Sequence, residues 1–243
     1  NGGDGNDTLY GEEGFDTISG GNGNDFISPG SAGGIYKGDA GDDVIFSSLV
    51  SPENMDGGTG IDTVHFYGET DYSYNMATGL TSFEGESFIN FENAEMGWGD
   101  DTVYGSALNN VIKGDSGDDI LFGKDGNDTL YGDTGSDIIV GGAGKDLLYG
   151  HEVGSLFGFE PTKFKFLATS ESAVGVNRDI ITDFKPGIDK IDLSAIDAEI
   201  GGADNAFNFI GTSAFSLPAA VRYYVDNNNT IVQLDLYSDG DMS

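Results

Sequence analysis

Aspartates recur at a fixed interval of nine residues, and this interval is the feature of the sequence most able to do chemistry. A typical unit opens with glycine, places an acidic residue sixth and places a large apolar residue eighth, as in GKDGNDTLY (123–131). Carboxylates stacked about 5 Å apart, the distance between neighbouring strands, repel each other unless a cation lies between them. Calcium suits such a position because it accepts mixtures of carboxylate and backbone carbonyl oxygens. The interval therefore predicts rows of calcium sites.

The repeat register runs over 2–46, returns at 57–65 and runs again over 96–149. We predict that calcium is bound by the side chains at position six, namely Asp7, Asp16, Asp25, Asp43, Asp62, Asp101, Asn110, Asp119, Asp128, Asp137 and Asp146. Glycines in the first half of each unit permit a tight turn and leave its carbonyl oxygens open to the ion. The predicted glycine contributors are Gly2, Gly5, Gly20, Gly23, Gly38, Gly41, Gly114, Gly117, Gly123, Gly126, Gly132, Gly135, Gly141 and Gly144.

The same pattern predicts the fold that positions these residues. An apolar eighth position predicts a very short strand with one side chain pointing inward, and the glycine-rich half predicts a turn. Two nonapeptides then make one coil, and neighbouring coils must stack because no single unit can bury its own strand. We predict an all-β fold, a parallel β-roll (a calcium-stacked β-solenoid) followed by a smaller β-rich C-terminal cap. A lone aspartate before glycine is more often an Asx-turn residue, but the shared register favours calcium ligation.

The composition excludes several classes of function. The formal net charge is −32 with only 10 Lys and Arg residues, which opposes binding to nucleic acid or to an anionic membrane. There is no cysteine, so disulfides and thiolate metal sites are impossible. No apolar run is long enough to predict a membrane-spanning helix. Strong acidity can indicate disorder, but 37% hydrophobic residues at regular spacing argue against it here.

The units match the GGxGxDxUx pattern, in which U is a large apolar residue, and so the chain resembles the RTX (repeats-in-toxin) family. The resemblance implies that position six binds calcium through its side chain and that positions one to four bind through carbonyl oxygens, with each ion between loops n and n+2. It implies the pairs Asp7–Asp25, Asp25–Asp43, Asp101–Asp119, Asp119–Asp137 and Asp128–Asp146, and about five to seven ions. The positions that depart from this pattern are Gly34, Asn110 and Ser155.

A second resemblance covers the C-terminal part. The stretch RDIITDFKPGIDKIDLSAID (178–197) is similar to the C-terminal domain of serralysin-type secreted metalloproteases, which other type I secreted enzymes also carry. Strands are expected on both sides of the Lys185-Pro186-Gly187 turn, and 221–225 with 231–236 are expected to form a hairpin. The resemblance makes Glu171 and Asp179 candidate ligands of a capping calcium, with ordinary surface carboxylates as the alternative.

Four regions are expected: a first RTX block (1–65), an aromatic-rich solenoid insertion (66–95), a second RTX block (96–158) and a serralysin-like C-terminal domain (159–243). The chain starts inside the repeat and stops before that domain's usual last strand, so we expect a piece of a longer protein. The predicted function is a non-catalytic calcium-binding module of a secreted bacterial protein. It would be exported by a Gram-negative-type type I secretion machinery and would assist an upstream effector domain.

Two other functions remain open. The parent protein could be an enzyme, such as a serralysin-type metalloprotease or an alginate epimerase or lyase, whose catalytic domain lies upstream. The chain could instead be an adhesin or glycan-binding module, because aromatic residues in 66–95 and Trp98 could hold sugar rings. Core packing is the other explanation for those aromatics. Catalytic signatures are absent, since His65 and His151 do not form a His-Glu-x-x-His motif. Both histidines are expected at turn edges.

Overall fold

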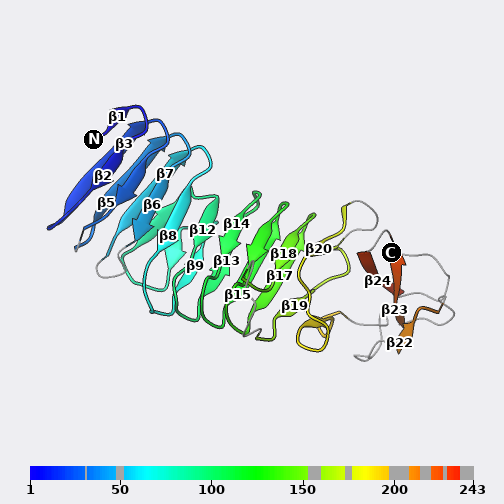
Figure 1. Cartoon of the computed structure of the whole chain (residues 1–243). Helices are drawn as coiled ribbons and strands as arrows, with labels where there is room; N and C mark the ends of the chain where they lie inside the picture. Colours follow the sequence, from blue (N-terminus) through cyan, green and yellow to red (C-terminus); the bar gives the residue numbers. More distant parts are fainter. Residues whose placement is uncertain are drawn as a thin grey trace.

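The computed structural model describes residues 1–30, 32–47, 52–152, 160–172, 177–196, 208–213, 220–226 and 229–235. Its short strands alternate between two facing sheets while the chain advances along one axis, coil after coil (Figure 1). A parallel β-solenoid of about eight turns spans residues 3–149 and is followed by a small antiparallel sheet. The predicted all-β parallel roll with a smaller β-rich C-terminal part is therefore confirmed.

One sheet extends along the whole solenoid and has nine strands. In spatial order these are β2 (Thr8–Tyr10), β4 (Phe26–Ser28), β6 (Val44–Ser47), β8 (Thr63–Phe66), β12 (Asn93–Glu95), β14 (Val111–Lys113), β16 (Thr129–Tyr131), β18 (Leu147–Tyr149) and β20 (Ile180–Ile181). All its pairings are parallel. In the second block the register advances by one coil of two nonapeptides, so that Thr129 pairs with Leu147.

The opposite side of the roll consists of two shorter sheets. The five-stranded sheet contains β1 (Gly3–Asp4), β3 (Asp16–Asn22), β5 (Gly34–Ala40), β7 (Asn54–Thr59) and β11 (Ser87–Ile89). The seven-stranded sheet contains β10 (Leu80–Thr81), β9 (Ser73–Asn75), β13 (Thr102–Tyr104), β15 (Ile120–Asp125), β17 (Ile138–Ala143), β19 (Lys163–Lys165) and β21 (Lys190–Asp192). They separate at 66–95, where β9 and β10 pair in the antiparallel sense.

The core lies between the facing sheets and is built from the eighth positions of the repeats. The row from the nine-stranded sheet includes Ile27, Ile45, Val64, Ile112, Leu130 and Leu148, all buried. In the insertion the interior is wider and aromatic, because Phe66 lies 4.7 Å from Tyr72, 5.6 Å from Tyr74 and 5.7 Å from Phe88 between ring centroids. Inward side chains alternate along each strand, as the period of two requires, so most strands contribute one whereas β8 contributes both Val64 and Phe66.

The turns adopt the conformations that the glycines predict. In most units, positions two and four of the repeat have positive φ, and Gly135, at position four, has a φ of 142°. A Cβ atom on Gly135 would lie only 1.8 Å from the carbonyl oxygen of Gly117 in the neighbouring coil. Position two tolerates other residues in the left-handed region, as at Lys124 and Asp133. Where the turn has this conformation, the fourth position thus requires glycine for both backbone conformation and space, whereas Leu108 occupies it in a unit without positive φ.

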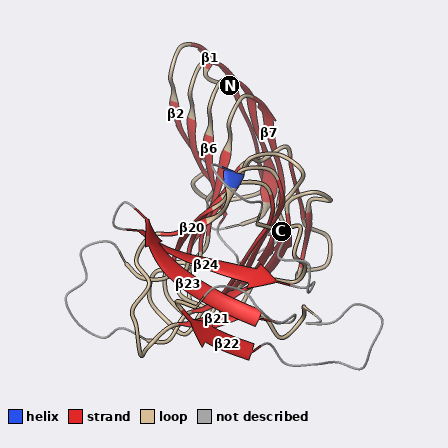
Figure 2. Cartoon of the chain, turned by 90° about the vertical axis from the view of Figure 1, so that its right-hand side faces the viewer, coloured by secondary structure: helices blue, strands red, loops and turns tan. Residues whose placement is uncertain are grey.

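The C-terminal strands only partly match the expectations for 159–243. β20 and β21 flank the predicted turn, but they join two different sheets of the solenoid and do not pair with each other. The predicted hairpin is present as β23 (Ala220–Asp226) and β24 (Asn229–Asp235), with β22 (Asn208–Gly211) beside it, and Figure 2 shows these strands at the end of the roll. The domain boundaries stay predictions.

The histidines differ in their placement. His65 lies inside strand β8, so the expectation of a turn-edge position is wrong for it. His151 follows β18 in a bend and is buried. Among the described residues, no helix has the length and apolar character that crossing a membrane requires.

Candidate metal centre

Acidic side chains form a continuous row along one edge of the nine-stranded sheet. The backbone N–H of most row members donates a hydrogen bond to the side-chain oxygen of the counterpart one coil further on. The donor–acceptor pairs are Asp7–Asp25 (2.7 Å), Asp25–Asp43 (2.7 Å), Asp43–Asp62 (2.8 Å), Asp62–Glu92 (2.9 Å), Asn110–Asp128 (2.7 Å), Asp128–Asp146 (2.9 Å) and Asp146–Asp179 (3.0 Å). Between Glu92 and Asn110 the link differs, because the side-chain amide of Asn110 donates to the Glu92 carbonyl oxygen (2.8 Å).

A second row lies along the edge of the seven-stranded sheet. The N–H of Tyr72 donates to Asp101 (2.7 Å), that of Asp101 to Asp119 (2.8 Å) and that of Asp119 to Asp137 (3.1 Å). Together the two rows bring every predicted aspartate pair side by side. That the members of a pair share an ion stays a prediction.

The second oxygen of most of these carboxylates is buried and has no hydrogen-bond partner among the described residues. The carboxylates concerned are Asp7, Asp16, Asp25, Asp43, Asp62, Asp119, Asp128, Asp137, Asp146 and Asp179, each through its Oδ2 atom. A buried, unpaired carboxylate oxygen is costly. Because this unpaired oxygen recurs at the same position of the repeat, it indicates that the rows bind a ligand that is not part of the protein.

Burial changes the protonation of these groups. Loss of hydration, followed by the charges of Asp137 and Asp101, raises the pKa of Asp119 to about 8. The same cause raises the pKa of Asp128 and of Asp137 to about 7. In each case the backbone N–H from the neighbouring coil acts in the opposite direction. A cation bound between these carboxylates would therefore stabilise their ionised form at neutral pH.

The donor set fits calcium. A Cβ atom on Gly20 would lie 2.2 Å from Asp25 Oδ2 and 2.7 Å from the carbonyl oxygen of Gly38, so carboxylate and carbonyl oxygens crowd around the glycine. Gly123 has the same surroundings, with Asp128 Oδ2 at 2.3 Å. No point in the described chain brings three His, Asp or Glu side chains together. An ion between coils would thus need backbone carbonyls as well, which suits a hard cation of high coordination number.

The row on the five-stranded sheet is interrupted at Gly34. A Cβ atom at Gly34 would lie 2.2 Å from the Tyr36 hydroxyl, so the phenol takes the space of the missing carboxylate. Burial, followed by the charges of Glu53 and Asp16, raises the pKa of Tyr36 to about 12. Glu53 is in register beside Gly34 and accepts a hydrogen bond from the Ser47 hydroxyl (2.8 Å). Asp16 thus lacks an aspartate partner, as expected.

The other two departures have different outcomes. Asn110 keeps its place in the row, and its side-chain amide donates to the Glu92 carbonyl oxygen (2.8 Å). Ser155 lies outside the described residues, and the strand register shows that its assignment was wrong. Ile138 pairs with Lys163, so the residue beside Asp137 is Thr162, whose N–H donates to Asp189 (3.1 Å).

The two candidates for a capping site have separate positions. Asp179 accepts a hydrogen bond from the N–H of Asp146 (3.0 Å), and its burial raises its pKa to about 7. Glu171 instead accepts from the N–H of Leu167 (2.7 Å), although its charge raises the pKa of both Asp146 and Asp179. Asp179 therefore continues the long row and Glu171 lies beside it. Their role as calcium ligands stays a prediction.

Sequence reasoning missed two features of the site. Glu92 fills the row between Asp62 and Asn110, although it lies outside the strict repeat register. Side chains at position five also form a ladder of hydrogen bonds, here called the position-five ladder. Its members accept from the N–H of position five in the next coil, as in Asn24 to Asn6 (2.9 Å) and Asp118 to Asp100 (2.8 Å). The frequent Asn or Asp at position five was the available signal.

Most aromatic residues of the insertion belong to the core. Phe66, Tyr72, Tyr74, Phe88 and Phe91 are buried, which supports packing as their role. Outside the core, aromatic rings follow the nine-stranded sheet, and Phe46 and His65 stack at 4.4 Å with an interplanar angle of 16°. Stacked rings cover each other's faces and leave mainly their edges for a ligand. Tyr67 and Trp98 stay exposed at 61% and 55%, with their centroids 5.8 Å apart.

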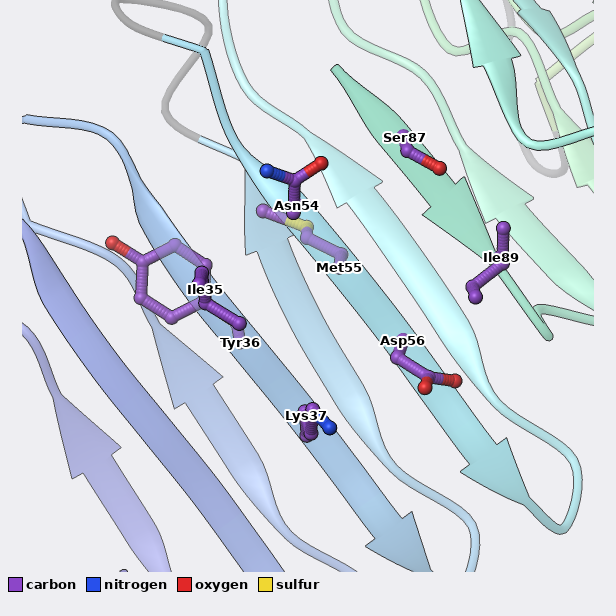
Figure 3. A pocket seen from close by; sticks show the side chains of 8 residues that line it. All are labelled: Ile35, Tyr36, Lys37, Asn54, Met55, Asp56, Ser87 and Ile89. Carbon is purple, nitrogen blue, oxygen red and sulfur yellow. The ribbon is translucent and has the colours of Figure 1, made fainter. Parts of the chain in front are cut away.

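Two other places do not look like active sites. Figure 3 shows a depression on the outer face of β5, β7 and β11, lined by Ile35, Tyr36, Lys37, Asn54, Met55, Asp56, Ser87 and Ile89. Its polar lining groups do not converge on one point. At the end of the roll, His151 Nε2 lies 3.0 Å from Asp189 Oδ2. Asp189 also accepts from the backbone N–H groups of Thr162 and Lys185, so this buried pair connects chain segments.

Comparisons with known proteins agree with this geometry. The family model of the RTX calcium-binding nonapeptide repeat (4 copies) matches residues 1–34, 97–130 and 122–152. A comparison of the chain with curated proteins found no match. The matched ranges lie in both parts of the solenoid and contain most of the row aspartates. The chain thus carries RTX calcium-binding repeats arranged as a β-roll.

Proposed function

We propose that this RTX calcium-binding β-roll module folds in response to calcium after secretion and then assists an attached effector domain. The observation that carries the proposal is the set of buried, unpartnered carboxylate oxygens stacked at one repeat position. The metal ligands would be the eleven position-six residues named above, from Asp7 to Asp146, with carbonyl oxygens of the neighbouring glycines. Asp179 and Glu171 would add a site at the end of the long row. About five to seven ions would be bound.

The proposed switch follows from electrostatics. The folded chain brings carboxylates of neighbouring coils together and removes their hydration, so their charges oppose folding at neutral pH. Calcium supplies positive charge and replaces the lost hydration, and its binding free energy becomes folding free energy. Extracellular calcium modules bind at about 10⁻⁴–10⁻³ M, far above cytosolic calcium levels. The chain would therefore stay expanded inside the cell and become compact outside it.

The wider biological context is part of the same proposal. RTX repeats are typical of type I secreted proteins, which supports export by such a machinery. The resemblance of 178–197 to the serralysin-type C-terminal domain supports it too. The effector would lie upstream, and a serralysin-type metalloprotease or an alginate epimerase or lyase would suit this arrangement. The β-roll itself is a non-catalytic module.

A calcium titration of the chelated chain tests the switch. We expect a cooperative change from an expanded coil to compact β structure between micromolar and millimolar calcium, measured by far-UV circular dichroism and small-angle scattering. Asp119→Ala and Asp128→Ala should shift the midpoint to higher calcium. Glu13→Gln removes an exposed charge of the first block and should leave the midpoint nearly unchanged. A chain that is equally compact with and without calcium would show that no switch exists.

A glycan-binding role is the second candidate, and the exposed Tyr67–Trp98 pair favours it. Two aromatic rings 5.8 Å apart on the surface could hold a sugar ring. Binding to a glycan array at saturating calcium, lost in Trp98→Ala and kept in Phe83→Ala, would support this function. An array with no binding at saturating calcium would rule it out for the sugars displayed.

A further inference from the structure

The two edges of the second block differ in charge at position five of the repeat. The edge of the seven-stranded sheet, here called the Asp edge, carries Asp71, Asp100 and Asp118 in the position-five ladder. The edge of the nine-stranded sheet, here called the Asn edge, carries Asn109 and Asn127 at the same place. The two edges have the same backbone arrangement but a different number of carboxylates.

The position-five side chains are held by the same hydrogen bonds on both edges. The N–H of Asp118 donates to Asp100 (2.8 Å) and that of Ser136 to Asp118 (2.8 Å) on the Asp edge. On the Asn edge, the N–H of Asn127 donates to Asn109 (2.7 Å) and that of Lys145 to Asn127 (2.9 Å). An exchange between Asp and Asn at these places therefore changes the charge while the acceptor oxygen stays in place.

These extra charges act on the buried oxygens at position six. The charge of Asp100 raises the pKa of Asp119, and that of Asp118 raises the pKa of Asp137. Both Asp119 and Asp137 are at most 1% exposed and point an unpartnered Oδ2 into the space between coils. On the Asn edge, the side chains next to Asp128 and Asp146 are Asn127 and Lys145, so no carboxylate precedes either in sequence.

The difference in the number of carboxylates is largest when positions five and six of two successive loops are compared between the edges. On the Asp edge, the 100/101 and 118/119 pairs contribute four carboxylates, namely Asp100, Asp101, Asp118 and Asp119. At the same two positions, the 109/110 and 127/128 pairs contribute one, from Asp128, because Asn109, Asn110 and Asn127 are neutral. Each edge also has one acid earlier in these loops, Asp115 on the Asp edge and Asp125 on the Asn edge, so this difference remains. Calcium affinity in oxygen-ligand sites is tuned by the charge of the ligand set and its surroundings.

We propose that the residue at position five sets the order of calcium loading, so that the Asp edge fills at lower calcium than the Asn edge. This inference rests on the calcium binding proposed above and deepens it. A carboxylate about 7 Å from a divalent cation favours binding roughly eightfold without salt and about twofold at physiological ionic strength. Two such carboxylates should therefore separate the midpoints of the two edges by about fivefold at physiological salt.

Two reciprocal double variants test the proposal. Asp100→Asn with Asp118→Asn removes charge from the Asp edge, and Asn109→Asp with Asn127→Asp adds charge to the Asn edge. Calcium loading would be followed separately on the two edges through the backbone amide NMR signals of Asp101 and Asp128, with total binding from calorimetry. In the unaltered chain, the Asp101 signal should respond at calcium at least fivefold lower than the Asp128 signal, because Asn110 is neutral as well. The first variant should raise the Asp101 midpoint about fivefold, and the second should lower the Asp128 midpoint about fivefold.

The salt dependence provides an independent readout. The separation between the edges should become smaller in 0.5 M KCl, because screening weakens charge effects beyond the ligand shell. Equal midpoints in the unaltered chain, or midpoints that neither double variant moves, would overturn this inference while calcium-triggered folding stands. A chain that binds no calcium would overturn both proposals. Asp4→Asn, an exposed acid in the first coil, is the matched control and should leave both signals unchanged.

Discussion

Replacing Asp119 by asparagine should have opposite effects on the metal-free and the calcium-loaded roll. Asp119 is fully buried, its Oδ1 accepts from the N–H of Asp101 and its Oδ2 has no partner. Asparagine keeps the acceptor oxygen and removes the charge. Without calcium the variant should be more stable than the original chain, because no buried charge is left uncompensated. With calcium it should be less stable, because a charged ligand is lost.

The magnitude follows from the pKa of Asp119, which is raised from 3.8 to about 8 by burial. A carboxyl whose pKa is raised in the folded state contributes stability below about pH 4, and this contribution is lost as the pH rises through about 8. One pKa unit corresponds to 1.36 kcal/mol, so the raised pKa of Asp119 destabilises the metal-free fold by about 5 kcal/mol at pH 7.5, relative to a group with an unchanged pKa. Burying an amide costs about 1–3 kcal/mol in turn. The net stabilisation should be about 2–4 kcal/mol.

The assay measures folding of the variant and the original chain at pH 7.5 under two conditions. In chelator, the concentration of sucrose or trimethylamine N-oxide needed to fold the chain should be lower for the variant, since such osmolytes favour burial. In millimolar calcium, urea should unfold the variant at a lower concentration. Asn110 shows that the roll tolerates an amide at position six, where it donates to the Glu92 carbonyl oxygen. If the variant were less stable under both conditions, the burial argument for the rows would be refuted.

Three further predictions follow from the same geometry. In chelator with enough sucrose or trimethylamine N-oxide to fold the chain, the melting temperature should rise as the pH falls from 8 to about 5.5. The reason is that the raised pKa values of the row carboxyls, about 7 for Asp128 and Asp137, make the metal-free fold more stable when they are protonated. In calcium the trend should reverse, and a flat profile in chelator would contradict the pKa argument. Gly135→Ala should lower the free energy of unfolding in urea by more than 2 kcal/mol, since φ is 142° and the new Cβ would lie 1.8 Å from a carbonyl oxygen. Gly187→Ala, whose new Cβ would have no atom within 4 Å, should lower it by about 1 kcal/mol. Leu121→Ala should lower the free energy of unfolding in calcium by about 2–5 kcal/mol because its side chain is completely buried, and a change under 1 kcal/mol would mean that the interior is loosely packed.

Much of the fold could be predicted because one short pattern carries it. Position eight alone identifies the inward side chains, and glycine at positions one and four identifies the turns. The stacking of Asp101, Asp119 and Asp137 then follows, since one coil contains two units. Local chemistry repeated at a constant interval left few other arrangements for these residues.

The parts that could not be predicted depend on loop lengths and on side-chain direction. Thr162, and not Ser155, is the neighbour of Asp137 in the next coil, because the chain between β18 and β19 is longer than one unit. No local signal in the sequence shows where the next strand begins. Glu92 enters the long row for the same reason, after an insertion of irregular length. The position-five ladder was missed because an Asn or Asp side chain can accept from several N–H groups, and only the stacked coils select one.

The two ladders have a consequence for how such a chain can change its length. The position-five and position-six hydrogen bonds that join two residues of the second block connect residues 18 positions apart. Removing or adding 18 residues would bring equivalent partners together again, on the same sheet and the same edge. Removing nine residues, for example 110–118, would instead move each later loop to the opposite edge and place Asn127 beside Asp100. Within the strict repeat, duplication or deletion therefore keeps each loop on its own edge only when it involves whole coils.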